Sequence, residues 1–163
     1  MDGNRRWAKE HGLPALAGHK KVANDILEPL IEYAAKRGVK YMTFWAWSTE
    51  NWEREKKEVE GIMRIFRDVI SRRWQKLHEK GVQIRVIGDI SKFADDIRKA
   101  LEKVIAQTKD NTKITAVFAL NYGGRDELLR AMSKFFVFTN HESRITNHDQ
   151  ESFASFLDTS GIP

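Results

Sequence analysis

The chain has 163 residues, of which 41% are hydrophobic, and it carries 28 Lys and Arg against 23 Asp and Glu, a formal net charge of +5. This length and apolar content suffice for one globular core, so we expect a single domain over residues 1–163. Cysteine is absent, which excludes disulfide scaffolds, thiolate zinc sites and cysteine nucleophiles. No apolar run approaches the ~20 residues that cross a bilayer, and no secretory signal follows Met1, so we expect a cytoplasmic protein.

The positive charge is concentrated in the segment 54–80, which holds nine basic and five acidic residues. All five tryptophans lie in the first half of the chain. A basic protein with aromatic residues is typical of one that binds an anionic partner. Composition alone leaves three classes of partner open: nucleic acid, a phosphorylated metabolite and a membrane surface.

The first predicted helix covers residues 20–37, where apolar residues recur at helical spacing and Gly38 takes the expected C-terminal position. Pro29 removes one backbone donor from this helix and is expected to kink it. The apolar and aromatic run VKYMTFWAW (39–47) predicts a strand buried on both faces. The polar sequence STENWERE then predicts a loop.

Residues 56–80 predict a long amphipathic helix of about seven turns, because apolar residues repeat every three or four positions between charges. Strands are predicted at 82–89 and 113–121, with a helix at 94–107 between them. Another helix opens at NYGGRDEL. A short final helix is expected near residues 150–157, with Asp149 as its N-cap.

Strands that alternate with helices of this length predict an α/β fold with a mostly parallel sheet covered by helices on both faces. Ligands bind such sheets at the carboxyl ends of the strands, which are expected in AWSTEN, IGD and LNYGGR. The first residues carry a loop of the kind that joins a strand to a helix, and no strand follows the last helix. We therefore expect the chain to be part of a larger α/β domain.

The opening segment MDGNRRW combines a carboxylate, a Gly-Asn turn and two arginines. Arginine side chains and exposed backbone N–H groups bind diphosphate oxygens, and Asp2 is suited to hold a Mg²⁺ ion that bridges the same oxygens. The alternative is an ordinary Asp-Gly turn before a solvated helix. His19 is similarly open to two interpretations, as a donor to an anion near a helix N-terminus or as a surface or capping residue.

The segment STENWER (48–54) places a hydroxyl, a carboxylate, an amide, an indole and a guanidinium directly after a buried strand, so it is open to two interpretations, a functional cleft or a generic loop. NYGGR permits close backbone approach but does not match the dinucleotide pattern GxGxxG. Phosphate-loop, HExxH and GxSxG motifs are also absent. Asp95 and Asp96 lack the third aspartate of a DDxxD metal box and are expected to be helix N-terminal charges.

Taken together and in this order, MDGNRRWA, the Gly-His pair, AWSTENWER, IRVIGD and LNYGGRDEL closely resemble the cis-prenyltransferases, the undecaprenyl diphosphate synthase family. The resemblance covers nearly the whole chain and implies a parallel sheet surrounded by helices. It implies a transferase that condenses isopentenyl diphosphate with an allylic diphosphate of the farnesyl type, giving a Z-polyprenyl diphosphate carrier lipid, with Mg²⁺ as cofactor. It also implies a homodimer, and peripheral membrane association would suit a lipid product.

The resemblance assigns roles to the residues that match the family's motifs. Asp2 matches the catalytic aspartate that engages Mg²⁺ and diphosphate, and Asn51 matches the proposed proton acceptor. The substrate-binding positions that it implies are Gly3, Asn4, Arg5, Arg6, Trp7, His19, Ser48, Thr49, Glu50, Trp52 and Arg54. Glu58 resembles an acidic residue near a mobile loop.

These residue types suit the ionisation of an allylic C–O bond, because Arg5, Arg6 and Mg²⁺ would place positive charge where the departing diphosphate becomes negative. Asn51 is a weak base, so we expect it to position or relay the proton that a diphosphate oxygen takes. The hydrocarbon product needs an apolar tunnel. We expect it between the helices 20–37 and 59–77 and the strand 42–47, although these residues could equally form only core.

The sequence departs from the family at two places. Ala15 stands where the family has an arginine that contacts the allylic diphosphate, a loss of ~1.5–3 kcal/mol of binding. The chain also ends at Pro163, before the RTGGE-type segment of the isopentenyl diphosphate site. We therefore expect only the allylic half of the site, and little turnover from the chain alone.

Two other functions compete with catalysis. The alternative from the same fold is a non-catalytic member that binds a partner subunit or a lipid. Nucleic-acid binding by the basic helix is not expected, because its basic residues alternate with acidic ones.

Overall fold

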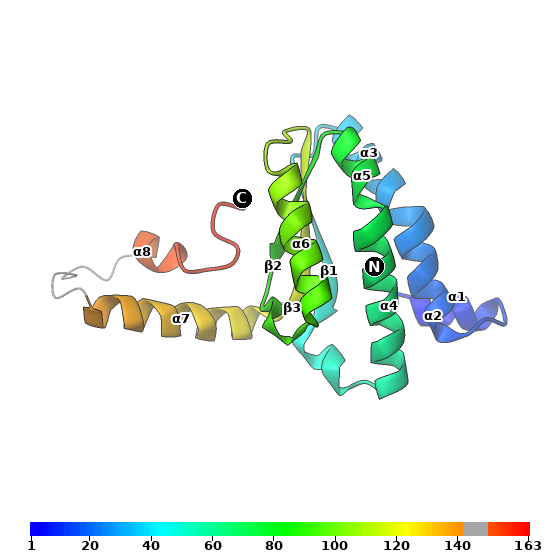
Figure 1. Ribbon diagram of the computed structural model, residues 1–163, viewed down its shortest axis with the longest axis horizontal. Helices are drawn as coiled ribbons and strands as arrows, with labels where there is room; N and C mark the ends of the chain where they lie inside the picture. Colours follow the sequence, from blue (N-terminus) through cyan, green and yellow to red (C-terminus); the bar gives the residue numbers. More distant parts are fainter. Residues whose placement is uncertain (142–149) are drawn as a thin grey trace.

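The computed structural model describes residues 1–141 and 150–163 (Figure 1). Its centre is a three-stranded parallel sheet of β1 (Tyr41–Ser48), β2 (Val82–Ile87) and β3 (Ile114–Tyr122), in the order β1–β3–β2. The predicted α/β class with a parallel sheet is therefore confirmed. The central strand β3 is buried along most of its length, as predicted for 113–121.

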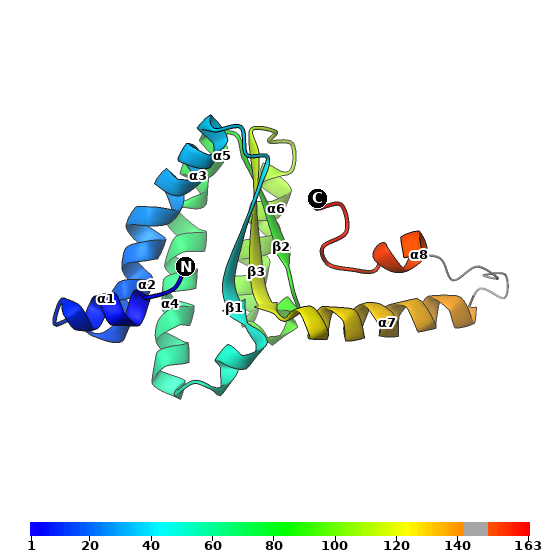
Figure 2. The ribbon, with the colours of Figure 1, turned by 180° about the vertical axis from the view of Figure 1, so that it is seen from behind.

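The helices α3 (Leu27–Lys36), α5 (Trp74–Glu79) and α6 (Asp95–Thr108) pack on one face of the sheet. Ile31, Leu77 and Val104 come from these three helices and meet Phe44 and Ile84 of the strands in one apolar cluster. Figure 2 shows the sheet from its other side, with α6 behind the strands. These three helices therefore form one layer against a single face of the sheet.

The strand β1 is not buried on both faces, so that prediction was wrong. Phe44 and Trp47 are buried against the helices, whereas Tyr41 is exposed and Trp45 is 66% exposed. The pairing with β3 shifts register between Trp45 and Trp47, and this irregularity at Ala46 turns two aromatic side chains two positions apart to different surroundings. The apolar run could not reveal this, because an edge strand with one covered face has the same composition.

The helical segment before β1 consists of α2 (Ala15–Lys21), the π-helical turn η1 (Val22–Ile26) and α3, so it begins earlier than predicted. The irregularity expected from Pro29 takes the form of η1. In a π-helical register the N–H of residue 29 would bond to the carbonyl of residue 24, but proline has no N–H. Arg73 supplies the donor instead, since its Nη1 lies 2.7 Å from the Asn24 carbonyl oxygen.

The segment predicted as one helix over 56–80 is divided into α4 (Lys56–Arg72) and α5. The break lies at Arg73, whose φ of −109° and ψ of −19° depart from helical values. Arg73 is the residue that donates to Asn24, so a contact with a distant helix coincides with the break.

The remaining elements are α1 (Asn4–Glu10), the 3₁₀ turns η2 (Thr49–Glu53) and η3 (Ile90–Lys92), α7 (Gly124–His141) and α8 (Gln150–Ala154). Figures 1 and 2 show α7 extending away from the sheet, with α8 folded back toward it. Phe135 of α7 packs against Phe153 and Phe156. The predicted N-cap Asp149 lies outside the described residues. Within residues 1–141 and 150–163, no helix is long and apolar enough to span a membrane.

Candidate active site

The segments that follow the three strands meet at the carboxyl edge of the sheet, as predicted. Trp52 in η2, after β1, donates its indole N–H to Asn121 at the end of β3, over 2.8 Å. Asn121 in turn donates to the Asp89 carbonyl, after β2, over 2.7 Å. A Cβ on Gly123 would lie 3.0 Å from Thr49 Oγ1. Side chains from all three segments can therefore act on one ligand.

The turn η2 begins with a reciprocal capping arrangement between Ser48 and Asn51. The Asn51 Oδ1 accepts from the Ser48 backbone N–H over 3.0 Å, and the Ser48 side chain accepts from the Asn51 backbone. A hydrogen bond to the Ser48 side chain is also the main reason that the pKa of Glu50 lies below its usual value. Asn51 thus has its amide oxygen occupied, which favours an orienting role over that of a base.

The N-terminal loop is built around Gly3, whose φ of 86° needs a residue without a side chain. The Asp2 carboxylate accepts from the Gly3 N–H and from Arg6, with 3.0 Å between Arg6 Nη2 and Asp2 Oδ2. Asp2 is 96% exposed, and Arg5 and Arg6 are exposed beside it. These groups are therefore open to an anionic ligand from solvent.

The helix α1 rests directly on α2, where Gly18 is buried. A Cβ on Gly18 would lie 1.9 Å from the Asn4 carbonyl oxygen, which leaves no room for a side chain. Trp7 lies on α1 and stacks on His11, with ring centroids 4.3 Å apart. The close contact at Gly18 sets the position of the N-terminal loop relative to His19.

His19 is partly buried next to two cationic side chains. Burial first, then Arg54 and Arg5, lower its pKa, and Glu58 opposes them. Arg54 forms an ion pair with Glu58, with 2.8 Å between Nη1 and Oε1. His19 Nε2 is buried with no hydrogen-bond partner in the part of the chain that the structure describes. The imidazole is therefore neutral at pH 7, and a bound anion would favour its protonated form.

A cavity of about 430 Å³ lies between the sheet and the helices. Four of the predicted site residues line it: Asn4, His19, Asn51 and Arg54. The rest of its wall is mainly apolar and comes from η1, α3, α4 and β1, which were predicted to form a tunnel, and also from α5, α6, β2 and β3. Several wall residues, among them Phe44 and Ile62, also belong to the buried core, so the cavity is a hollow within that core.

The other predicted residues lie around the cavity and do not line it. Asp2, Gly3, Arg5, Arg6 and Trp7 lie in or beside α1, and Ser48, Thr49, Glu50 and Trp52 lie in or beside η2. Trp52 packs edge-on against Trp47 and Phe93, with ring centroids 5.2 and 5.3 Å apart. Ala15 is exposed at the first position of α2, at a point where a longer cationic side chain would be solvated.

Sequence reasoning missed three residues on which this geometry depends. Gly18 and Asn121 stand inside the recognised motifs but received no role of their own, although a glycine before a functional histidine and an asparagine before Gly-Gly are signals of close backbone approach. Arg73 carried no sequence signal, because its partner, the Asn24 carbonyl, is 49 positions away.

The donor set for a metal ion is small. In residues 1–141 and 150–163, no group of three or more His, Asp or Glu side chains is arranged to hold a metal ion. Mg²⁺ commonly keeps several waters and binds through one or two carboxylates together with substrate phosphates. Asp2 offers one exposed carboxylate, which suits a Mg²⁺ ion held jointly by protein, water and substrate phosphates. One carboxylate does not suit a site built from protein ligands alone.

Comparison with known proteins shows the family and the fold of the chain. The family model Prenyltransf, described as "Putative undecaprenyl diphosphate synthase", matches residues 1–163. The isoprenyl transferase of Clostridium perfringens is 39% identical over 165 residues, covering 100% of this chain and 64% of that protein. The chain thus spans less than two thirds of the length of this relative.

Two solved structures share the fold. Lavandulyl diphosphate synthase from Lavandula x intermedia, in complex with dimethylallyl diphosphate, has a TM-score of 0.90 and 30% identity, covering 98% of this chain and 68% of that chain. A probable undecaprenyl diphosphate synthase from Campylobacter jejuni has a TM-score of 0.72 and 26% identity, covering 81% and 62%. On the family match and the identity to isoprenyl transferases, the chain belongs to the undecaprenyl diphosphate synthase family.

Proposed function

We propose that the protein acts as a cis-prenyltransferase, which condenses isopentenyl diphosphate with an allylic diphosphate to lengthen a prenyl chain. One observation carries this proposal: an apolar cavity of about 430 Å³ has polar residues, His19, Asn51 and Arg54, in its wall. That volume is within the ~300–1,000 Å³ typical of ligand pockets. A cavity of this kind suits an amphiphile with an anionic head and a hydrocarbon tail.

The N-terminal loop and His19 would bind the allylic diphosphate. Arg5 and Arg6 are exposed cations, and arginine binds phosphate oxygens through paired hydrogen bonds. The relative from Lavandula x intermedia is in complex with dimethylallyl diphosphate, which is a substrate of this chemical class. The allylic tail would then enter the apolar cavity between α3, α4 and β1.

The reaction breaks the allylic C–O bond and releases diphosphate. The isopentenyl double bond attacks the allylic carbon, a C–C bond forms, and a proton leaves for a diphosphate oxygen. Asp2 would hold Mg²⁺, which when bound neutralises charge on the diphosphate. Asn51, whose amide oxygen is fixed by the Ser48 N–H, would orient the reacting groups and leave the proton to the diphosphate.

We further propose that this chain contributes the allylic half of the site, and that the product is a Z-polyprenyl carrier lipid. The residues that the chain carries support the first part, because Arg5, Arg6 and His19 match the positions that the resemblance assigns to the allylic diphosphate. Homodimerisation, a cytoplasmic location with peripheral membrane association, and the absence of nucleic-acid binding stay predictions.

Incorporation of radiolabelled isopentenyl diphosphate tests the proposal, with farnesyl diphosphate as primer, Mg²⁺ present, and the full-length protein as enzyme. Asp2→Ala is expected to lower turnover by about 100-fold or more, because a charge that assists diphosphate departure is lost. Thermal stability should hardly change, since Asp2 is exposed.

Glu10→Ala is the matched control, because Glu10 is an exposed carboxylate at the end of α1, the helix that follows Asp2. Equal turnover of the wild type and Asp2→Ala would contradict the role of Asp2. A wild type that binds dimethylallyl diphosphate without any incorporation would instead support the non-catalytic alternative.

A further inference from the structure

Asn121 lies at the carboxyl end of β3 and is 2% exposed. Its φ of 48° is the only positive φ of a residue other than glycine in the described parts of the chain. A side chain makes this backbone conformation unfavourable, and such residues persist where the surrounding structure holds them. The contacts of Asn121 therefore hold its backbone in this conformation.

The Asn121 amide joins the segments that follow the other two strands. Its Oδ1 accepts from Trp52 Nε1 over 2.8 Å, and its Nδ2 donates to the Asp89 carbonyl over 2.7 Å. The Asp89 N–H also donates to the Asn121 carbonyl over 3.3 Å. An amide suits this position, because it presents an acceptor and a donor on two separate atoms and so bonds to both partners at once.

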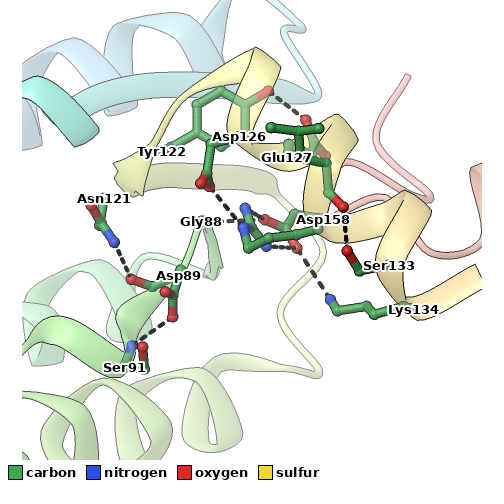
Figure 3. A network of polar contacts seen from close by, with 12 residues as sticks. Gly88, Asp89, Ser91, Asn121, Tyr122, Asp126, Glu127, Ser133, Lys134 and Asp158 are labelled. Atoms are coloured by element: carbon green, nitrogen blue, oxygen red, sulfur yellow. Dashed lines mark hydrogen bonds and ion pairs between the residues drawn. The ribbon is translucent and has the colours of Figure 1, made fainter. Parts of the chain in front are cut away.

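The turn that receives Asn121 is held from its other side as well, as Figure 3 shows. Asp158 accepts from the Gly88 N–H over 3.1 Å, and Asp89 accepts from the Ser91 N–H over 2.9 Å. A Cβ on Gly88 would lie 2.2 Å from the Leu120 carbonyl oxygen, so the turn is pressed against β3. Asn121 is thus anchored to a fixed turn and reaches from it to Trp52.

We propose that Asn121 is a positioning residue, which holds η2 through Trp52 and thereby sets the place of Asn51 in the wall of the cavity. This rests on the proposed function, since Asn51 faces the cavity in which the condensation would occur. The Trp52 indole N–H then donates to Asn121 and not to a substrate oxygen. The diphosphate-binding groups Asp2, Arg5 and His19 lie on other elements and do not depend on this link.

Asn121→Asp is the sharpest test, because it keeps the size of the side chain and replaces the donor to the Asp89 carbonyl with a second acceptor. We expect kcat to fall by about 10–100-fold, because a displaced Asn51 no longer orients the reacting groups in the transition state. The KM for the allylic diphosphate should stay within about 3-fold of the wild-type value. Trp52→Phe, which removes only the N–H, should reproduce the kcat loss if Asn121→Asp folds poorly.

Asn111→Asp is the matched control at the opposite end of β2, where Asn111 Nδ2 donates to the Val82 carbonyl over the same 2.7 Å. It makes the same chemical change and is expected to lower stability while leaving kcat within about 2-fold of wild type. A kcat loss of equal size in both variants would overturn the positioning role of Asn121.

Hydrogen–deuterium exchange of residues 48–54 provides a measurement that does not need turnover. Asn121→Asp should speed exchange in η2, where the Ser48 and Arg54 N–H groups bond to Asn51, and Asn111→Asp should not. Unchanged exchange in both Asn121→Asp and Trp52→Phe overturns the link from Asn121 to η2, because an aspartate alone still accepts from the Trp52 N–H. Faster exchange with unchanged kcat overturns its effect on the reaction. A full-length wild type without turnover would contradict the proposed function, while the exchange comparison would still decide whether Asn121 holds η2.

Discussion

Gly18 of α2 lies directly against the backbone of Asn4, the first residue of α1. A Cβ placed there lies 1.9 Å from the Asn4 carbonyl oxygen, far inside van der Waals contact. That atom belongs to the backbone and cannot rotate away, so α1, which carries Arg6, would have to move together with the loop that carries Asp2. The sequence motif contains this glycine, but the contact that demands it is visible only when the two helices are in place.

Gly18→Ala is expected to raise KM for the allylic diphosphate by about 10-fold, because the diphosphate-binding loop is displaced. It should also lower the free energy of unfolding by about 1–3 kcal/mol, as an overpacked contact does. Substrate titration and urea unfolding measure the two effects. Gly124→Ala, whose Cβ would meet no atom within 4 Å, should leave stability nearly unchanged. Equal stability losses in the two variants would contradict the steric argument.

The divided helix shows how one element adapts to another. In the π-helical register Pro29 offers the Asn24 carbonyl no N–H, and Arg73, at the break between α4 and α5, donates to that carbonyl over 2.7 Å. Residues of η1 and Arg73 itself line the cavity, so this bond ties two parts of its wall together. Periodicity predicted both helices correctly in kind, since apolar spacing is a local property, but it could not reveal a break that depends on a partner elsewhere in the chain.

Arg73→Met is expected to lower the free energy of unfolding by about 1–3 kcal/mol, because a backbone carbonyl loses its charged donor. When Pro29→Ala is also present, the stability loss caused by Arg73→Met should be smaller by at least about 0.5 kcal/mol. The reason is that alanine restores a backbone N–H near the Asn24 carbonyl. Urea unfolding of the four proteins in this cycle measures the coupling. Arg64→Met, at an exposed position of α4, controls for the loss of a positive charge. Strictly additive losses would rule out the shared carbonyl.

At the scale of the whole molecule, the C-terminal residues are held to the sheet by polar contacts. Arg130 of α7 donates to both oxygens of Asp158, over 3.0 and 2.6 Å. Buried Glu127 accepts from Thr159 and from the Tyr122 hydroxyl, a bond that raises the pKa of Tyr122 to about 12. Ile162 packs on Ile87, Val117 and Ala119, on the sheet face opposite the helices.

The charge of Asp158 makes this attachment sensitive to pH. Burial alone opposes its ionisation, but the hydrogen bonds from Arg130 outweigh that and hold its pKa below the usual 3.8. The stabilisation is therefore complete above the unfolded-state pKa of ~3.9 and is lost as pH falls through the lower folded-state pKa. Acidification below pH ~4 should destabilise the protein in part through this residue.

Asp158→Asn is expected to lower the free energy of unfolding at pH 7 by about 2–4 kcal/mol, because Arg130 loses the charge of Asp158 and keeps that of Asp126. The variant should also show a smaller stability loss than the wild type between pH ~4 and ~2. Urea unfolding across that range measures both quantities. Asp110→Asn, at an exposed position, is the control. If Asp158→Asn kept the full pH dependence of the wild type, Asp158 would not be a source of that dependence.

The sequence by itself determined the family, the α/β class, the order of the helices and strands, and the neighbourhood of the three strand ends. These follow from motifs and periodicities that are local in the chain. Only the tertiary structure decided that Trp45 is exposed while Trp47 is buried, that the cavity exists, and that Asn121 joins Trp52 to Asp89. Trp52 and Asn121 are 69 positions apart, and Gly88 and Asp158 are 70 apart. Contacts of that kind depend on how elements pack, and no local pattern of side chains encodes them.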